Sequence, residues 1–514
     1  MSLTNYIIKN KKKFPKKIAY MCENKSITYE QLYKNVALLS ENLKKLGIRK
    51  GDKIAIIYGN SILYPQIFYS AAYLNLSIVP LNPSLSEFDI TNQLNKVKAK
   101  YLFSWSGFLN RLNFKKLYLK KKYCFDLDSS SRDYTNYSDL IQKNNSNRQL
   151  KIKKAKSKTN FLFGLTSGST SDPKVSIWSQ QIKIDRGLHA KKMYNLNHND
   201  RVIISTPMYH SISFRLIVLP IILGASCVIL KKFTVKDWFE KIKKRKITFS
   251  ILVSDQIEMI SSKLKKPYLN KGFPLKKLVS CCSPLKEEIK LRLIKQSFIK
   301  VFDTYGASEV GTITNINLKK EIKKIKSNGK ATTGYDVRIF QNSKMTKIPF
   351  KQGEICCKTK NIFSGYYQLN KGEKSNKNLN NFFLTGDIGY FDKQKYLYVT
   401  GRKKEIIIRG GVNIFPSDIE KVLNSFPNIK ESAVIGYESK NLGQMIYAFL
   451  KLKKSFRIDR NKFFNFCLDK LADFQIPSKF FIIEEFPRAS LHKISKYLLK
   501  RDILKYTKKE SLIS

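Results

Sequence analysis

The sequence predicts an α/β fold with two parts: a large multi-layer N-terminal domain with mixed or parallel sheets, and a small α+β domain after it. The first observation is that short apolar runs alternate with stretches of helical apolar spacing between residues 28 and 280. This alternation is typical of strand–helix–strand units. The second observation is the length of 514 residues, which is too great for one hydrophobic core.

The first predicted elements show the alternation. Residues 28–45 have apolar side chains at helical spacing and are followed by Gly47, which predicts a helix that ends there. Residues 51–58 then predict a turn and a buried strand, and residues 77–83 another short strand, with an amphipathic stretch between them. Four later apolar runs also predict strands: residues 201–206, 225–230, 247–253 and 277–280.

The most apolar run, residues 216–230, is shorter than a membrane span and contains Pro220 and Gly224. It predicts the end of a buried helix, a turn and a strand, so we expect no transmembrane segment. The first residues lack the long apolar region of a signal peptide. The eight cysteines have no CxxC metal spacing. We therefore expect a cytoplasmic protein with reduced thiols.

The formal net charge is +57, from 96 Lys and Arg against 39 Asp and Glu. A charge of this size raises the hypothesis of a basic nucleic-acid-binding protein. The lysines are spread along the chain, however, as in residues 151–158 and 319–326, and they form no arginine-rich stripe with interleaved aromatic residues. We expect no specific nucleic-acid partner, and we keep this function as the alternative from another class.

The sequence pattern changes near Asp387, and a compact segment of predicted strands and a helix follows Thr400. We therefore place a domain boundary at about residue 402. The N-terminal domain is thus predicted to comprise residues 1–401 and the C-terminal domain residues 402–514. Within the second domain, residues 417–425 predict a helix, and residues 432–436 and 446–452 predict strands.

The stretch LTSGSTSDPKVS follows an apolar strand at residues 161–165. Its glycine, Gly168, lets the backbone turn tightly and present N–H groups, and Lys174 adds a cation. Hydroxyl groups come from Thr166, Ser167, Ser169 and Thr170. Such a loop can wrap the phosphates of a nucleotide, although its spacing is not that of a P-loop. Taken alone, the stretch is equally compatible with a Ser/Thr-rich surface turn.

Three further stretches offer groups that bind parts of a nucleotide. In FDTYGASEVG, Tyr305 offers a flat ring for a base, and Glu309 offers a carboxylate for Mg²⁺. In FFLTGDIGYFD, Asp387 follows Gly386 on a predicted turn and suits ribose hydroxyls. In TGRKKEIIIRGGVNIFPSDIE, Arg402 suits a phosphate or ribose, and the two following glycines allow close backbone approach.

Together and in this order, these stretches resemble the adenylate-forming superfamily, which includes acyl-CoA synthetases, aryl-CoA ligases, amino-acid-adenylating domains and firefly-type luciferases. The resemblance runs from about Thr28 to the C-terminus. The matching motifs are residues 166–174, 305–309, 385–387, 401–405 and 487–496, with weaker matches at residues 280–285, 353–357 and 416–420.

The resemblance implies that ATP activates a carboxylate as an acyl-adenylate, which a thiol, most often that of CoA, then attacks. It implies catalytic roles for Lys493, Glu309 and Thr170, with Glu309 binding Mg²⁺. Because two anions must meet in this reaction, cations near the reacting groups matter. The residues implied in ATP or AMP binding are Thr166, Ser167, Gly168, Ser169, Thr170, Lys174, Ser283, Asp303, Thr304, Tyr305, Gly306, Ser308, Asp387 and Arg402.

The resemblance also implies that the C-terminal domain is mobile and rotates about a hinge at Lys404 between the two half-reactions. In one pose Lys493 completes the adenylation site. In the other pose the loop with Gly410, Gly411 and Asn413 lines the channel for the pantetheine arm of CoA, where a side chain at a glycine would obstruct it.

The acid substrate is less well defined. His210 ends the sequence Pro-Met-Tyr-His, which resembles the Pro-x-x-His motif beside the carboxylate pocket of acyl- and aryl-CoA ligases; a satisfied core histidine is the alternative. Residues 206–214 lack the Asp that usually pairs with the ammonium group in amino-acid-adenylating domains. We expect a fatty or aromatic acid, with fatty acid metabolism as the setting.

The residues leave two acceptors for the acyl group open: CoA and the phosphopantetheine of a separate acyl carrier protein. The usual acidity of carrier proteins would suit this basic chain. The chain also departs from the motifs of the superfamily in five places, at Ser171, Cys281, Ser308, Ala489 and His492. In the last motif Lys496 is a second cation and thus an alternative to Lys493. The spacing of Pro487 and Ile494 favours Lys493.

Overall fold

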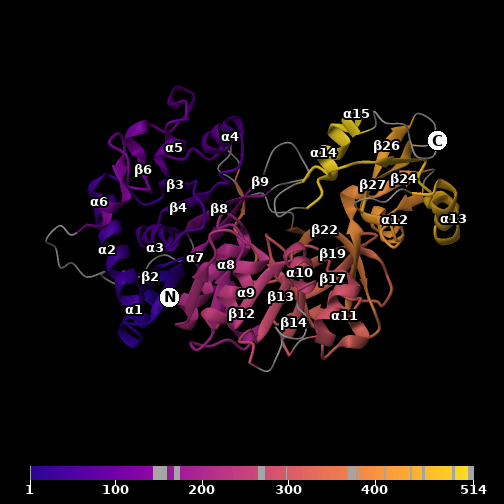
Figure 1. Cartoon of the computed structure of the whole chain (residues 1–514), viewed down its shortest axis with the longest axis horizontal. Coiled ribbons are helices and arrows are strands. Elements are labelled where there is room, and N and C mark those ends of the chain that lie inside the picture. Colours follow the sequence, from indigo (N-terminus) through magenta and orange to yellow (C-terminus); the bar gives the residue numbers. More distant parts are fainter. Residues whose placement is uncertain are drawn as a thin grey trace.

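The computed structural model describes residues 2–142, 159–166, 174–263, 272–296, 298–367, 378–379, 381–409, 412–439, 443–453, 458–488 and 493–506. Within these residues the chain forms four sheets with helices around and between them. Figure 1 shows the last sheet and its helices, in orange and yellow, gathered apart from the larger N-terminal part. The predicted α/β fold, with a large multi-layer N-terminal part and a smaller C-terminal part, is confirmed.

The first of the large sheets has the order β20-β9-β8-β4-β3-β5-β6-β7. All its strands from β8 to β7 pair in parallel, whereas β9 pairs with β8 and β20 in antiparallel fashion. The strands are β3 (Lys53–Ile56), β4 (Ser77–Pro80), β5 (Tyr101–Ser104), β6 (Cys124–Asp126), β7 (Thr135–Asn136), β8 (Asn160–Thr166), β9 (Lys174–Ser179) and β20 (Gly365–Tyr366). The candidate phosphate loop therefore joins two antiparallel strands near one edge of a mostly parallel sheet.

The second large sheet has the order β16-β15-β14-β13-β12-β10-β11-β1-β2, and its strands from β14 to β1 are parallel. Its strands are β1 (Ile18–Cys22), β2 (Lys25–Thr28), β10 (Arg201–Ile204), β11 (Ser226–Ile229), β12 (Phe249–Val253), β13 (Lys277–Cys281), β14 (Lys300–Ala307), β15 (Gly311–Asn317) and β16 (Lys330–Ala331). The strands predicted within residues 51–58, 77–83, 201–206, 225–230, 247–253 and 277–280 are all confirmed.

Helices of the N-terminal part form where the sequence provides start and stop signals. Helix α2 (Tyr29–Lys45) begins after Thr28, whose side chain accepts a hydrogen bond from the Gln31 amide. Helix α8 (Ser211–Leu223) ends at Gly224, which has a φ of 71°, and β11 follows, as predicted for this apolar run. The described residues contain no helix that is long and apolar enough to cross a membrane.

Helix α3 (Leu63–Leu74) differs from its prediction as an amphipathic helix. All but two of its residues are buried, because it packs against α1, α2 and β4. The other helices of this part are α1 (Leu3–Lys13), α4 (Glu87–Val97), α5 (Ser106–Leu109), α6 (Tyr137–Ile141), α7 (Gln180–Met193), α9 (Val235–Lys244), α10 (Ser254–Ser261) and α11 (Glu287–Gln296). One apolar core joins residues of both large sheets with residues of α3 and α8.

A third sheet, with the order β18-β17-β19-β22-β21 and β23 paired to β22, is antiparallel. Its strands are β17 (Asp336–Gln341), β18 (Lys344–Thr346), β19 (Gly353–Lys358), β21 (Asn378–Leu379), β22 (Phe382–Phe391) and β23 (Leu397–Arg402). The prediction that Gly386 and Asp387 form a turn is wrong. They lie inside β22, where the pairing with β19 shifts its register and Gly386 has a φ of 78°.

The C-terminal part is a five-stranded sheet with the order β25-β24-β27-β26 and β28 paired to β27. Its elements are β24 (Ile407–Arg409), β25 (Val412–Ile414), α12 (Pro416–Leu423), β26 (Ile429–Ser439), β27 (Gly443–Leu452), α13 (Arg460–Lys470), β28 (Lys479–Ile482), α14 (Lys496–Arg501) and α15 (Ile503–Tyr506). The predicted helix and two strands of this part are confirmed. The boundary at residue 402 stays a prediction.

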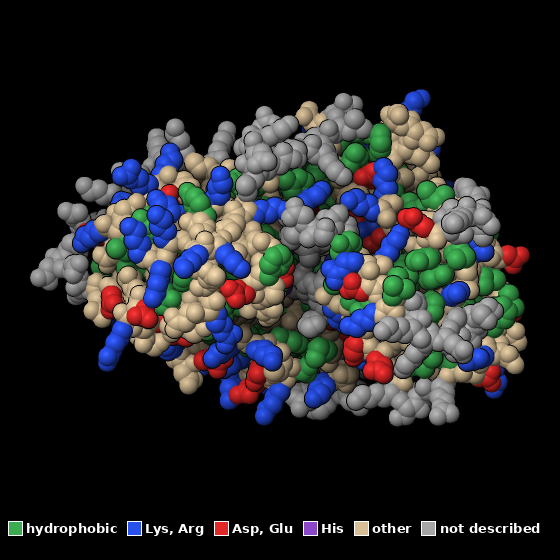
Figure 2. All heavy atoms as spheres, turned by 90° about the horizontal axis from the view of Figure 1, so that it is seen from above, with side chains coloured by type: hydrophobic (Ala, Val, Ile, Leu, Met, Phe, Trp, Pro, Cys, Tyr) green, Lys and Arg blue, Asp and Glu red, His purple; other side chains and the backbone are tan. Residues whose placement is uncertain are grey.

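The surface is rich in Lys and Arg, as the composition requires. On the face shown in Figure 2, these side chains are spread over the whole width of the molecule and are interspersed with acidic and apolar side chains. This distribution on that face agrees with the expectation from the sequence that the lysines form no single stripe.

Candidate active site

The candidate phosphate loop leaves the end of β8 and returns at the start of β9, where Thr166 and Lys174 are paired across the two strands. The predicted residues Ser167, Gly168, Ser169 and Thr170, and also Ser171, lie outside the described residues. Lys174 Nζ lies 5.2 Å from the centre of the Tyr366 ring. The Tyr366 hydroxyl donates a hydrogen bond of 2.7 Å to Glu309 Oε1. The base of the loop and the predicted Mg²⁺ ligand are thus joined through one tyrosine.

The backbone around Glu309 is held by Arg186 of α7. The guanidinium donates to the Ser308 carbonyl at 2.9 Å and to the Glu309 carbonyl at 2.7 Å, and it also bonds the Asn361 carbonyl. Trp178 Nε1 donates to the Ser308 carbonyl as well, at 3.1 Å. The sequence analysis missed Arg186, because one basic residue on a helix has no distinguishing signal in a chain with 96 Lys and Arg.

The predicted base-binding residues lie on β14. Gly306 is required there, because a Cβ atom at this position would lie 2.0 Å from the Gly311 carbonyl oxygen. The Tyr305 hydroxyl donates to Asp387 Oδ2 at 2.8 Å and to Thr385 Oγ1 at 3.3 Å. Two motifs that are about 80 residues apart in the sequence therefore meet through Tyr305.

Asp387 is the point at which several predicted residues converge. Its side chain is largely buried, and Oδ1 lies 3.2 Å from Arg402 Nε. Burial raises the pKa of Asp387, while Arg402, the hydrogen bond from Tyr305 and the charge of Lys493 lower it. A carboxylate held in this way keeps acceptor capacity for the hydroxyl groups of a ribose.

The last motif contains two lysines that the structure separates. Lys496 forms ion pairs with Glu420 at 2.7 Å and with Glu405 at 3.0 Å, both within the C-terminal part. Lys493 is exposed. Its charge opposes the rise that burial causes in the pKa of Asp387, and it adds to the lowering of the Cys282 pKa that the hydrogen bond with Cys281 causes. Lys496 is thus bound within the C-terminal part, and the role of Lys493 in the site stays a prediction. Ala489 and His492 lie outside the described residues.

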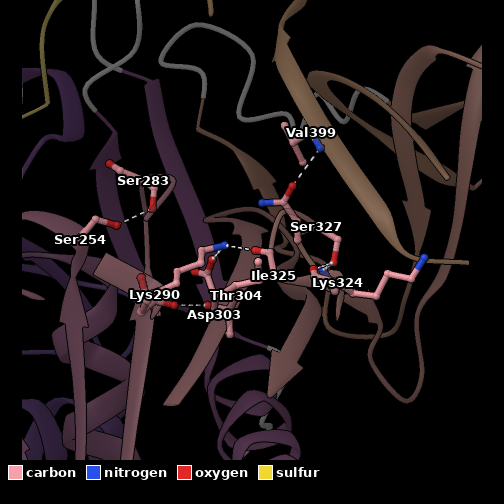
Figure 3. A network of polar contacts seen from close by, with 12 residues as sticks. Ser254, Ser283, Lys290, Asp303, Thr304, Lys324, Ile325, Ser327 and Val399 are labelled. Carbon is pink, nitrogen blue, oxygen red and sulfur yellow. Dashed lines mark hydrogen bonds and ion pairs between the residues drawn. The ribbon is translucent and has the colours of Figure 1, made fainter. Parts of the chain in front are cut away.

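The side chain of Asp303 forms a buried ion pair. Its carboxylate lies 2.7 Å from Lys290 Nζ, and both side chains are about 95% buried. Figure 3 shows this pair next to Thr304, whose hydroxyl donates to the Ser280 carbonyl, and it also shows Ser283, whose carbonyl accepts from Ser254. Asp303 thus joins β14 to α11 through its side chain, and its contact with the nucleotide stays a prediction.

His210 stands at the start of α8, where the acid pocket was predicted. Its ring packs on Tyr209 with a centroid distance of 4.4 Å. Burial lowers the pKa of His210 to about 4, so the imidazole is neutral at neutral pH. The preceding turn is fixed by Asn60, which accepts from the Met208 amide at 2.7 Å and donates to the Thr206 carbonyl at 3.1 Å. The sequence analysis did not identify Asn60, which lies on a distant loop.

The predicted CoA and hinge residues lie in the first part of the C-terminal segment. Lys404 is exposed in a short 3₁₀ helix, Lys403–Glu405, between β23 and β24, and Asn413 is exposed on β25 opposite Ile408. Gly410 and Gly411 lie outside the described residues. The side chain of Ser417 at the start of α12 donates to the Thr400 carbonyl and so contacts β23.

The site suits a Mg²⁺ ion that binds together with the phosphates of the nucleotide. The described residues contain no group of three or more His, Cys, Asp or Glu that could hold a metal ion by themselves. Mg²⁺ is usually bound by one or two carboxylates together with phosphate oxygens and water. A single carboxylate at Glu309, next to the base of the candidate phosphate loop, fits this pattern.

Comparison with known proteins then identifies the family. The family model described as "AMP-binding enzyme" matches residues 8–367, and the model of its C-terminal domain matches residues 418–493. The chain belongs to the AMP-binding enzyme family. This result confirms the resemblance to adenylate-forming enzymes that the five matching motifs indicated.

Relatives with assigned names match over nearly the whole chain. The 2-succinylbenzoate–CoA ligase of Oceanobacillus iheyensis is 29% identical over 496 residues, which cover 93% of this chain and 94% of the relative. The 2-succinylbenzoate–CoA ligase of Geobacillus sp. (strain WCH70) is 25% identical over 505 residues, which cover 97% of each chain.

Solved structures share the fold at lower identity. The o-succinylbenzoate CoA synthetase (MenE) from Bacillus subtilis with its acyl-adenylate intermediate has a TM-score of 0.84, 23% identity and 97% coverage of both chains. ATP-bound MatB from Rhodopseudomonas palustris has a TM-score of 0.85, 20% identity and coverage of 98% and 100%. A double mutant of the Bacillus subtilis enzyme with a product analogue has a TM-score of 0.68, 22% identity and coverage of 97% and 98%. The chain is thus closer in overall shape to the acyl-adenylate complex than to the product-analogue complex.

Proposed function

We propose that this chain activates 2-succinylbenzoate, or a closely related aromatic keto acid with two carboxylates, and joins it to CoA. The broader activity is that of an AMP-forming acid–thiol ligase, which uses ATP and Mg²⁺ to form an acyl-adenylate and CoA to convert it into a thioester. The proposed substrate is supported by relatives of that name that match over at least 93% of this chain. These relatives favour an aromatic acid over the fatty acid that the sequence also allowed.

The chemistry explains why the motifs must converge. A free carboxylate is a poor acylating agent, because its leaving group would be an oxide ion. In the first step a carboxylate oxygen bonds to the α-phosphorus of ATP, and the bond from that phosphorus to pyrophosphate breaks. In the second step the sulfur of CoA attacks the carbonyl carbon, and the bond to AMP breaks. Both steps join or separate anions, so fixed cations lower their barriers.

The observation that carries the proposal is the convergence on Asp387. Tyr305, Arg402 and Lys493 come from three different motifs, and all act on this one buried carboxylate. In our proposal Asp387 accepts hydrogen bonds from the ribose, and Tyr305 contributes to the base pocket. We propose that Lys493, whose charge acts on Asp387, neutralises charge that develops between the carboxylate and the α-phosphate.

Glu309 and the candidate phosphate loop act on the leaving group. Mg²⁺, when bound, supplies positive charge to the departing pyrophosphate. Glu309 would hold it, with its side chain oriented by Tyr366 and its backbone by Arg186. Lys174 at the start of β9 adds a second cation on the side of the site where Glu309 lies. Roles for Thr170 and for the other loop residues stay predictions.

The domain boundary between residues 401 and 402 and the hinge at Lys404 are also part of the proposal. The two family models leave residues 368–417 between them, and Lys404 is exposed within that interval. Gly410, Gly411 and Asn413 are proposed to contact the pantetheine arm. A cytoplasmic location is proposed as well, since all eight cysteines are free thiols, which suits a reducing compartment.

The test is acid-dependent release of pyrophosphate from ATP and Mg²⁺, with hydroxylamine to trap the activated acid. The panel comprises 2-succinylbenzoate, benzoate, cinnamate, short and long fatty acids, and amino acids. We expect 2-succinylbenzoate to give the highest kcat/KM. Replacing hydroxylamine with CoA, and then with a phosphopantetheine-loaded acyl carrier protein, separates the proposed acceptor from the carrier alternative. A higher rate with a fatty acid or with the carrier would contradict the corresponding part of the proposal.

A further inference from the structure

Two adjacent cysteines at the end of β13 have their sulfur atoms in contact. Cys281 is the last residue of β13, Cys282 follows it, and their Sγ atoms lie 3.9 Å apart, which is hydrogen-bond distance for sulfur. Cys281 Sγ also donates to the Leu252 carbonyl at 3.5 Å. Cys282 has a φ of 77°, a left-handed conformation that residues other than glycine rarely adopt. Adjacent side chains of a strand point to opposite faces, so this turn is what lets the two sulfur atoms meet. We name Cys281 and Cys282 the cysteine pair.

The chain contains a second pair of adjacent cysteines, Cys356 and Cys357, which lacks these properties. Both lie inside β19 and are fully buried, and as neighbours in a strand they point to opposite faces. Burial raises the pKa of each thiol to about 12. Adjacency in the sequence is therefore not sufficient for a reactive pair of thiols, and this second pair serves as an internal control.

The cysteine pair combines an accessible thiolate with a neighbouring thiol. All eight cysteines lie in the described part of the chain: six are buried, Cys281 is half-buried and Cys282 is exposed. The hydrogen bond with Cys281 and, after it, the charges of Lys493 and Arg215 lower the pKa of Cys282 to about 7, although the surrounding protein atoms oppose the shift. The same hydrogen bond raises the pKa of Cys281, so that thiol keeps its proton. Cysteines that sense oxidants are accessible, have a low pKa and stand beside a second thiol, and Cys282 meets all three conditions.

The cysteine pair lies beside residues that we propose to bind ATP. The hydroxyl of Thr304, the residue before Tyr305 on β14, donates to the Ser280 carbonyl at 2.8 Å. On the other side of the pair, the Ser254 hydroxyl donates to the Ser283 carbonyl at 2.5 Å, a bond that Figure 3 also shows. Strands β13 and β14 are parallel, and ligands of such sheets bind outside the carboxyl ends of the strands. The pair thus lies between two anchored serines, at the edge of the sheet where we propose that the nucleotide binds.

We propose that the cysteine pair is a site of reversible oxidation by peroxides, and that the disulfide formed between its two residues weakens the binding of ATP. The second part of this inference rests on the proposed function. In the first step the Cys282 thiolate attacks a peroxide oxygen, the O–O bond breaks, and hydroxide leaves and becomes water by taking up a proton. In the second step the Cys281 sulfur attacks the sulfur of the resulting sulfenic acid, the S–O bond breaks, and water leaves with the Cys281 proton. Two thiols are oxidised, and one hydrogen peroxide is reduced to two molecules of water.

The geometry of such a disulfide explains both its reversibility and its effect. Adjacent Cα atoms are about 3.8 Å apart across a trans peptide bond, whereas the Cα atoms of a disulfide are usually at least about 4.4 Å apart. The disulfide is therefore strained, and a strained, exposed disulfide is readily reduced. Because Ser280 and Ser283 are anchored, the backbone between them must change its shape when the bond forms. The loss of a single hydrogen bond to the nucleotide corresponds to about a 10-fold higher Kd, and we expect at least this change for MgATP.

The test treats the purified wild-type protein with hydrogen peroxide and then blocks the remaining free thiols with iodoacetamide under denaturing conditions. Mass spectrometry analyses the tryptic peptide of residues 278–286, which contains both cysteines of the pair. We expect this peptide to lose two hydrogen atoms and to escape alkylation, and dithiothreitol should restore two thiols that alkylate. Cys356 and Cys357 should stay reduced. Isothermal titration calorimetry then measures the Kd for MgATP, which should rise at least about 10-fold on oxidation and return with dithiothreitol.

Three variants make the test specific to the cysteine pair. Cys282→Ser lacks the reactive thiol, so its Kd for MgATP should be the same before and after peroxide treatment. Cys281→Ser keeps the reactive thiol but not its partner, so Cys282 should proceed to a sulfinic acid that dithiothreitol does not reduce. The matched control is Cys356→Ala, in the buried pair, which should respond to peroxide as the wild type does.

A peptide with two alkylated cysteines after peroxide treatment, or an equal response of the wild type and Cys282→Ser, would overturn the proposal. A disulfide that leaves the Kd for MgATP unchanged would overturn its effect on binding. If the reduced protein binds no ATP, the proposed function fails. The peptide analysis needs no ligand, so it still decides whether the pair is a site of oxidation.

Discussion

Lys496 Nζ lies 2.7 Å from Glu420 Oε1, and this ion pair holds the lysine inside the C-terminal part of the chain. Glu405 approaches the same ammonium group to 3.0 Å. Lys493, three residues earlier, forms no ion pair within the described residues, and its charge contributes to the electrostatics of Asp387 and Cys282. The structure thus gives Lys496 a structural role, which agrees with the spacing that favours Lys493 as the catalytic lysine.

Lys493→Ala should lower the rate of acyl-adenylate formation by about 100- to 1,000-fold, since it removes a cation that stabilises the transition state. Lys496→Ala should instead reduce the free energy of unfolding by about 1–3 kcal/mol, because it leaves Glu405 and Glu420 without their partner. The hydroxylamine-trapping assay and urea unfolding measure the two effects. Lys500→Ala, which removes an exposed lysine of α14, is the control. A folded Lys496→Ala protein with the larger catalytic loss would reverse the two assignments.

Arg186→Lys should raise the KM for MgATP by about 10-fold or more. A lysine cannot bond three carbonyls in fixed geometry, so the backbone that carries Glu309 would lose its support. The dependence of the initial rate on Mg²⁺ and ATP concentration measures this effect. Arg292→Lys, at an exposed position on α11, is the matched control. An unchanged dependence on Mg²⁺ would show that Arg186 does not position Glu309.

Asp387→Asn should raise the KM for ATP by about 10- to 100-fold, the range expected for the loss of charge-assisted hydrogen bonds. Tyr305→Phe, which keeps the ring and removes only the hydroxyl that bonds Asp387, should raise it less, by about 3- to 10-fold. Steady-state kinetics at saturating acid and CoA separate these effects. If Asp387→Asn changed kcat alone, its proposed role in binding the ribose would be wrong.

The buried histidines should make the fold less stable in mild acid. Burial lowers the pKa of His189 to about 4, with contributions from Arg215 and Lys360, whereas an unfolded histidine titrates near 6.5. Below pH 6.5 the unfolded chain therefore binds a proton that the folded chain excludes, and stability falls as the pH falls toward 4.

His189→Gln should flatten this dependence, so that the difference in unfolding free energy between pH 6.5 and pH 4.5 shrinks by about 1–2 kcal/mol. Urea unfolding at a series of pH values measures it. The exposed His198 provides the control variant His198→Gln, which should retain the slope of the wild type. An identical slope in the wild type and His189→Gln would contradict the lowered pKa.

Local signals in the sequence predicted the elements and the order of the motifs. The helix start at Thr28 and the helix end at Gly224 are examples, because a cap or a left-handed residue is determined by its immediate neighbours. The Gly386–Asp387 pair was mistaken for a turn, because only the pairing of Asp387 with Arg402 on β23, and of the flanking residues with β19, shows that it lies in a strand.

Long-range contacts account for what the sequence did not predict. The partner of Asp303 is Lys290 on α11, and nothing in the motif around Asp303 indicates it. Arg186 on α7, which holds the backbone around Glu309, is a second example, because nothing in the sequence distinguishes it from the many lysines and arginines on the surface. Its burial, which only the fold reveals, separates it from them.

The most direct test of the central claim is to detect the acyl-adenylate itself. The wild-type protein is mixed with ATP, Mg²⁺ and 2-succinylbenzoate without CoA, and the quenched mixture is analysed by mass spectrometry before and after CoA is added. We predict an acid-dependent adenylate that disappears as the CoA thioester and AMP appear, and at least about 100-fold slower adenylate formation with Lys493→Ala. A folded wild-type protein that forms no adenylate with any acid of the panel would contradict the account.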